Sequence, residues 1–175
     1  VQTCALPIYN NSGAASVSKP TTTNPSTIVQ MDDGYMWKFM YTISTADKTK
    51  FTTSAFIPVK TLTVDDGSTQ WDVQENAAEG ALNVILLTNP GSGYSNGSNV
   101  VVTITGDGTF ATATANVNTS TNVVSSILIT DQGSGYSYAN VAITGGGGSG
   151  ATARAIISPP GGHGSDPVYE LGGSS

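Results

Sequence analysis

The sequence predicts an all-β protein, β-sandwich-like, with two repeated small β-units and long irregular termini. Three observations lead to this prediction. Only 10% of the 175 residues are charged, against a typical ~25%, while Gly, Thr, Ser, Asn and Val are abundant. One segment alternates apolar and polar residues at the period of a strand, and one motif occurs twice. β-Branched residues fit a pleated sheet, and Gly supplies the positive φ of tight turns.

The N-terminal segment does not read as part of the protein. Residues 1–8 match the translation of a common short-read library adapter (GTT CAG ACG TGT GCT CTT CCG ATC). We therefore expect residues 1–8, including the single cysteine Cys4, to be foreign, and we interpret the chain as a fragment. The alternative is an ordinary strand-like N-terminus. Residues 9–30 are rich in Ser, Thr, Asn and Pro, which predicts an extended linker.

Residues 31–80 form the first β-rich segment, and residues 34–45 are its clearest strand. Trp37, Phe39 and Tyr41 recur at period two, which places them on one face. Such a strip is either the core face of a sheet or an aromatic platform for sugar. We favour the core and expect at least two of the three side chains to be buried.

Residues 47–50 are expected to form a short connecting turn or helical turn, and most of the remaining segment is expected to be extended. Residues 51–59 and 61–64 carry strand-like patterns, and Trp71 and Val73 follow at strand spacing. An Asp-Asp-Gly sequence at 65–67 predicts a turn. A short helix is plausible only at 76–80.

Residues 81–157 contain an internal repeat. ILLTNPGSGYS begins at Ile85 and ILITDQGSGYS begins at Ile127, so Gly93 corresponds to Gly135 and Tyr94 to Tyr136. We expect two superposable β-units, with glycines where φ is positive. Each tyrosine should pack, in a matching position, against its own unit.

No residue pattern predicts an enzyme, a cofactor or a metal site. Residues 145–150 satisfy GxGxxG, but a strand pattern follows where a dinucleotide site requires a helix, so we expect a turn. His163 is the only histidine, and nothing points to a nucleophile with an oxyanion donor. The net charge of −6 argues against a nucleic-acid surface, and no apolar run is long enough to span a membrane.

Residues 158–175 form a tail rich in Gly and Pro, which predicts an irregular, poorly supported loop. We expect it to contact a partner subunit or a missing C-terminal part, with His163 as a structural donor and Asp166 as its partner or a turn-former. Its structural or interface candidates are Gly161, Gly162, His163, Gly164 and Asp166.

Three strings resemble a known family: DGYMWKFMYTIS from Asp33, the GSGY repeats, and SPPGGHGSDPVYELGG from Ser158. They are similar to the baseplate wedge subunit of contractile-tailed phages of the T-even type. The resemblance implies a structural virion protein without catalysis, a homodimer when intact, held by other baseplate wedge proteins. It would lie in the tail baseplate of the virion and be assembled in the host cytoplasm. The alternative is a carbohydrate-binding or adhesive extracellular β-repeat module.

Overall fold

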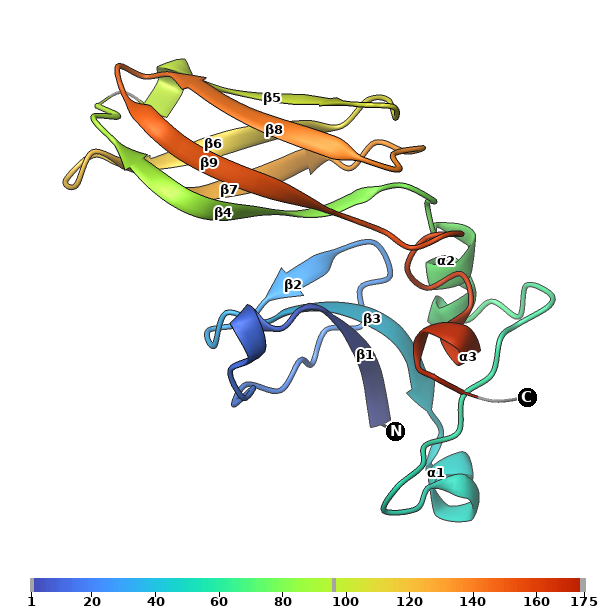
Figure 1. Cartoon of the computed structure of the whole chain (residues 1–175). Coiled ribbons are helices and arrows are strands. Elements are labelled where there is room, and N and C mark those ends of the chain that lie inside the picture. The colour runs from blue at the N-terminus through green and yellow to red at the C-terminus, as the bar shows by residue number, and fades with distance from the viewer. Residues whose placement is uncertain (1, 96, 174–175) are drawn as a thin grey trace. The chain divides into compact units, whose positions relative to one another are not determined.

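The all-β prediction is confirmed by a computed structural model that describes residues 2–95 and 97–173. Its strands form three antiparallel sheets (Figure 1). The chain divides into two compact units. Unit 1 contains the described residues up to Ala77 and those from His163 onward, and unit 2 contains Ala78–Gly162.

Unit 1 is built on a three-stranded sheet in the order β1-β3-β2. The strands are β1 (Gln2–Tyr9), β2 (Ile28–Gln30) and β3 (Met36–Ile43), and a 3-10 turn, η1, covers Asn11–Gly13. The predicted strand at 34–45 is the central strand, β3. Because β3 has a neighbour on each edge, its backbone groups are paired on both sides.

The segment interpreted as adapter forms strand β1. Gln2 pairs with Ile43 and Leu6 with Lys38, and Cys4 is buried beside Met40 and Tyr41. An edge strand of this kind needs only apolar residues at alternate positions and free backbone groups, so a foreign segment can fill the place as well as a native one. The origin of residues 1–8 therefore stays a prediction.

The described part of the chain has three short helices, of which the first contains the turn or helical turn expected at 47–50 and the other two replace structure expected to be extended or irregular. They are α1 (Thr45–Phe51), α2 (Thr69–Glu75) and α3 (Pro167–Glu170). The helix expected at 76–80 is wrong, and so is the strand at Trp71 and Val73. The Ser68 hydroxyl accepts a hydrogen bond from the Trp71 N–H and so caps α2. One helical turn then buries Val73 together with Gln70.

The strand patterns at 51–59 and 61–64 do not form strands. The side chain of Gln74 pairs with the backbone of Leu62 as a neighbouring strand would. The Leu62 N–H donates to Gln74 Oε1 (2.9 Å), and Gln74 Nε2 donates to the Leu62 carbonyl (3.0 Å). Since these groups are satisfied by a side chain from α2, segment 61–64 needs no ladder.

Unit 2 is a β-sandwich of six strands. They are β4 (Leu82–Ser92), β5 (Val100–Gly106), β6 (Thr112–Asn118), β7 (Val123–Asp131), β8 (Ala139–Gly145) and β9 (Ser149–Ile157), with a 3-10 turn, η2 (Gly97–Asn99), before β5. One sheet has the order β4-β9-β8-β5 and the other is the pair β6-β7. Strand β4 also contacts β7, and β5 contacts β6, so the two sheets face each other (Figure 1). The glycines at 145–150 form the turn between β8 and β9, as predicted.

The two repeats interlock strand for strand. The first supplies β4, β5 and β6, the second supplies β7, β8 and β9, and the pairs β4–β9, β5–β8 and β6–β7 each join one repeat to the other. The details match as well. Thr88 and Thr152 hydroxyls lie 2.8 Å apart, and the corresponding Thr130 and Thr112 hydroxyls lie 2.7 Å apart. Each pair lies beside a register shift in its ladder.

The glycines of the GSGY motif behave as predicted. Gly91 and Gly133 have φ values of 65° and 59°, and Gly93 and Gly135 have 78° and 75°. The N–H of Gly91 donates to Asn89 Oδ1 (2.8 Å) and that of Gly133 to Asp131 Oδ1 (2.9 Å). Only Gly takes up this left-handed conformation at no steric cost.

The tyrosines of the motif occupy matching positions, but the prediction that each packs against its own repeat is wrong. Tyr94 accepts a hydrogen bond from the N–H of Ala151, and Tyr136 accepts one from that of Ala111, both at 3.4 Å. A Cβ on Gly148 would lie 2.4 Å from the Tyr94 ring, and one on Gly108 would lie 2.4 Å from the Tyr136 ring. Because the ladders cross between repeats, each ring is covered by the turn of the other repeat.

Candidate functional site

The aromatic strip of β3 is a core face. Phe39 and Tyr41 are only 1% and 3% exposed, which confirms the expectation that at least two of the three are buried. The Tyr41 hydroxyl donates to the Pro58 carbonyl (2.8 Å), and Trp37 is half-buried and stacks on Tyr35. These rings cannot together form a sugar platform, because a platform requires accessible faces.

The tail from His163 onward is ordered by a short helix. Asp166 caps α3 by accepting from the N–H groups of Val168 and Tyr169, and Pro167 is its first residue. The prediction of an irregular, poorly supported loop is therefore wrong from His163 onward, where Gly164 and Pro167 are buried. Asp followed by Pro was the signal for this helix start in the sequence.

Of the two roles predicted for Asp166, that of partner to His163 is wrong, and that of turn-former agrees with its capping of α3. His163 Nδ1 lies 2.8 Å from Glu170 Oε2, and Glu170 Oε1 accepts the Gly164 N–H at 2.6 Å. Asp166 caps α3 and accepts a hydrogen bond from the Thr61 hydroxyl (2.7 Å). The single turn of α3 places Glu170 next to His163. Of the other tail candidates, Gly161 is exposed and Gly162 is buried within unit 2, where its Cβ would meet Ala78.

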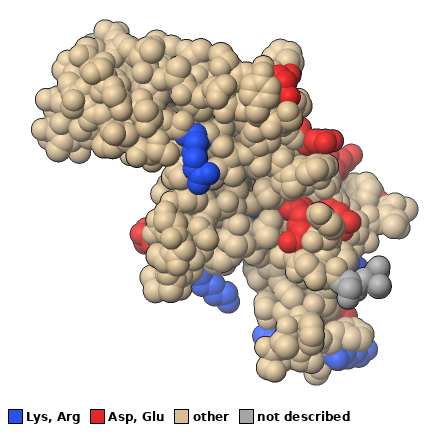
Figure 2. All heavy atoms as spheres, in the orientation of Figure 1, with Lys and Arg blue, Asp and Glu red and all other residues tan. Residues whose placement is uncertain are grey.

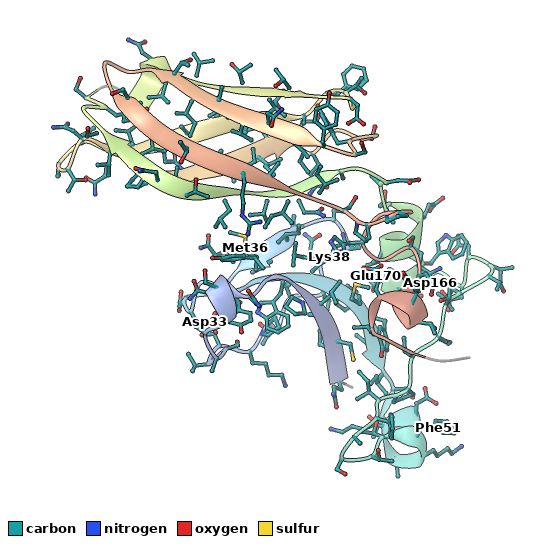
Figure 3. The ribbon with its side chains drawn as sticks, in the orientation of Figure 1. Asp33, Met36, Lys38, Phe51, Asp166 and Glu170 are labelled. Carbon is teal, nitrogen blue, oxygen red and sulfur yellow. The ribbon has the colours of Figure 1, made fainter. Side chains whose placement is uncertain are left out.

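Unit 1 also contains a buried lysine that interacts electrostatically with Glu170. Lys38 of β3 is 8% exposed, and its Nζ donates to the Pro25 carbonyl (2.9 Å). Burial lowers the pKa of Lys38, and the charge of Glu170 partly opposes this by raising it. We call Lys38, His163 and Glu170 the tail cluster; Figure 3 labels Lys38 and Glu170. His163 and Glu170 contact each other, and the charge of Glu170 acts on Lys38, so we expect the cluster to stabilise the tail against the sheet.

Sequence reasoning did not find the apolar surface beside α1. Phe51, Phe56 and Ile57 are 59%, 74% and 42% exposed, and we call these three residues the α1 patch; Phe51 is labelled in Figure 3. A turn fixes it: the Phe56 carbonyl accepts from the Thr53 N–H, and the Phe56 N–H donates to the Thr53 hydroxyl. Phe51 also borders an open hollow of about 220 Å³, lined in part by Tyr41, Ile43, Pro58 and Val59.

At one end of unit 2, a carboxylate ties two loops together. Asp107 Oδ1 accepts from the N–H groups of Ser137 (2.9 Å) and Tyr138 (3.2 Å), and its Oδ2 accepts from the Ser137 hydroxyl. The Ser137 hydroxyl and these N–H groups lower the pKa of Asp107 from 3.8 to about 2.

This shift predicts a specific pH dependence. Because the pKa is lower in the folded state, the stabilising contribution of Asp107 is complete above about pH 4 and is lost as pH falls through about 2. Asp107→Asn should therefore lower the unfolding midpoint by a few degrees at pH 7, and its difference from the wild type should shrink towards pH 2. Thermal unfolding followed by circular dichroism measures both. Ser137→Ala, which removes one donor, should give a smaller change of the same form; a pH-independent difference would contradict this account.

Comparison with known proteins does not assign the chain to a family. No protein-family profile matches the chain, and neither a curated protein nor a solved structure is significantly similar to it. In residues 2–95 and 97–173, no helix reaches the length and apolarity needed to cross a bilayer. Within the same ranges, no three His, Cys, Asp or Glu side chains converge in a way that could hold a metal ion.

Proposed function

We propose that this chain is a structural virion protein, a non-catalytic subunit of the baseplate wedge of a contractile phage tail. The observation that carries the proposal is the α1 patch, three exposed apolar side chains of which Phe51 ends helix α1 and Phe56 is held by a hydrogen-bonded turn. Large apolar side chains that are exposed within seven residues of one another are typical of a protein contact site. The proposed partners are other baseplate wedge proteins.

The character of the patch favours a permanent contact. Phe51 and Phe56 supply aromatic area, and the neighbouring hollow offers a place for a partner side chain. Interface cores combine such anchors with few charged residues. The chain as a whole is only 10% charged, although α1 itself carries Asp47, Lys48 and Lys50, and charged side chains are visible at the lower end of the view in Figure 2.

The choice of a tail baseplate comes from the sequence strings that resemble the wedge subunit. Two of them occupy defined places in unit 1: Asp33–Ser44 contains β3, and the part of the third string from His163 onward contains α3 and the tail cluster. The neighbouring genes give the first test. Tail and baseplate genes on both sides support the proposal, and a bacterial cell-wall or secretion cluster on both sides contradicts it. Immunogold labelling of the phage particles should then place the chain at the baseplate.

The α1 patch makes its own prediction. Phe51→Ser with Phe56→Ser should leave the fold unchanged, because both side chains are mostly exposed, and should abolish incorporation into tails. Incorporation is measured by blotting purified particles after complementation of a null phage. Val17→Ser, at an 85% exposed position of unit 1, is the matched control and should incorporate normally. Normal incorporation of the double variant would contradict a contact role for the patch.

The alternative, a carbohydrate-binding or adhesive module, lacks the platform that motivated it, since Phe39 and Tyr41 are buried. A glycan array tests it directly. Binding that is lost in Trp37→Ala, with the fold intact, would favour this alternative over assembly.

A further inference from the structure

Phe110 adopts a backbone conformation that is costly for an aromatic residue. Its φ is +68°, and its side chain is 80% exposed. The corresponding residue of the second repeat is Gly150, with φ +80°. Each directly precedes the alanine, Ala111 or Ala151, whose N–H donates to a buried tyrosine hydroxyl. The backbone conformation at this position therefore favours Gly, which the second repeat has, whereas the first repeat has Phe.

Nothing in the fold compensates for this strain, because an exposed ring gains little from its own unit. Strained residues of this kind are a mark of functional sites. The Phe110 backbone is also held firmly, since Thr109 and Ser134 exchange backbone hydrogen bonds (3.0 and 3.1 Å) and Ala111 bonds to Tyr136. Phe110 is thus a ring presented to solvent on a rigid turn.

A second exposed ring belongs to the adjoining loop. Tyr138 is 56% exposed, and its N–H is bound by Asp107, from the loop that also carries Phe110. Both rings therefore lie at the same end of the sandwich. We call this end, with Phe110, Tyr138 and the loop at 132–138, the aromatic end.

Two of the three acidic residues between 78 and 162, Asp107 and Asp131, bind this loop with their carboxylates, and the third, Glu79, binds it with its backbone carbonyl. Asp107 binds Ser137 and Tyr138, Asp131 accepts the Gly133 N–H, and the Glu79 carbonyl accepts the Gly135 N–H. The one basic residue between 78 and 162, Arg154, lies in β9 opposite Leu86 and Asn140 and is exposed on the outer face of the sheet. Figure 2 shows acidic side chains at one end of this unit and not on its visible strand face.

We propose that the aromatic end binds a basic segment of a partner protein. Arg or Lys side chains of that segment pack on the rings of Phe110 and Tyr138, and the nearby carboxylates supply the opposite charge. A fixed exposed ring suits this role because a guanidinium stacks flat on an aromatic face. The proposal does not depend on whether the chain belongs to a tail baseplate.

The test is a titration of the full chain, labelled with ¹⁵N, with a capped peptide of alternating Arg and Gly, followed by NMR. The amides of residues 107–111 and 132–138 should shift, and the shifts should weaken with added salt. The same peptide with citrulline in place of Arg removes the charge and should bind far more weakly. Shifts elsewhere, or equal shifts with both peptides, would overturn the proposal.

Phe110→Gly separates a binding role from a structural one. This substitution relieves the strained φ, so the unfolding midpoint should rise while peptide affinity falls roughly three- to tenfold. Asn122→Gly is the matched control: Asn122 is exposed with φ +54°, and its replacement should leave peptide affinity unchanged. Tyr138→Ser should also weaken binding. Unchanged affinity in both ring variants, or an oligosaccharide that shifts the same amides while the Arg peptide does not, would overturn the proposal.

Discussion

Replacement of Tyr94 by Ala is expected to destabilise unit 2 by about 3–5 kcal/mol, the range for deleting a large buried aromatic side chain. Tyr94 is fully buried, and its hydroxyl lies where the first repeat meets the turn of the second. Tyr136→Ala should have a similar effect, because Tyr136 is 7% exposed and makes the corresponding hydrogen bond to Ala111.

Urea unfolding followed by far-UV circular dichroism measures this loss, since unit 2 is mostly strand. Both tryptophans, Trp37 and Trp71, lie in unit 1, so fluorescence reports separately on that unit. Tyr94→Phe and Tyr136→Phe keep the ring and should each cost only about 1 kcal/mol. A loss below that value for either alanine variant would show that the rings do not join the repeats.

The second large effect is expected at the tail cluster. Glu170→Ala should destabilise unit 1 by about 3 kcal/mol, because it leaves the Gly164 N–H without its acceptor and the buried Lys38 without a nearby opposite charge. His163 also loses its partner. The change is measured as a shift in the urea midpoint of tryptophan fluorescence.

Two matched variants sharpen this prediction. Glu170→Gln keeps an acceptor oxygen for Gly164 but removes the charge, so its effect should be intermediate. Tyr169→Ala, on the same helix at a 78% exposed position, should change stability by less than about 0.5 kcal/mol. If Glu170→Ala were as mild as Tyr169→Ala, the tail would not be held by this cluster.

The sequence predicted those parts of the fold that local periodicity determines. The alternation from Trp37 to Tyr41 located the central strand, and the GSGY repeat located the glycines that need positive φ. Periodicity gives the face of a strand but not its partner. For that reason the repeats were expected to form two β-units packed together, each tyrosine against its own unit, whereas the ladders join the repeats and place each tyrosine under the turn of the other.

Helix α2 was missed because it is a single short run whose apolar residues also fit a strand, and α3 was missed because its segment is rich in Gly and Pro. Trp71 and Val73 satisfy period two, and only the Ser68 cap indicated a helix. The His163 contact was missed for a related reason: Glu170 becomes its neighbour only after α3 has formed. The α1 patch and Phe110 depend on exposure and on φ, which no residue pattern reports.

Hydrogen exchange on assembled particles tests the proposed function most directly. Purified phage tails and the free chain are compared by deuterium uptake and mass spectrometry of peptides that cover residues 51–57. The proposal predicts that these peptides are recovered from tails and exchange more slowly there than in the free chain, because the α1 patch is covered by a wedge partner. Absence of the chain from purified tails, or equal exchange at 51–57 in both samples, would contradict it.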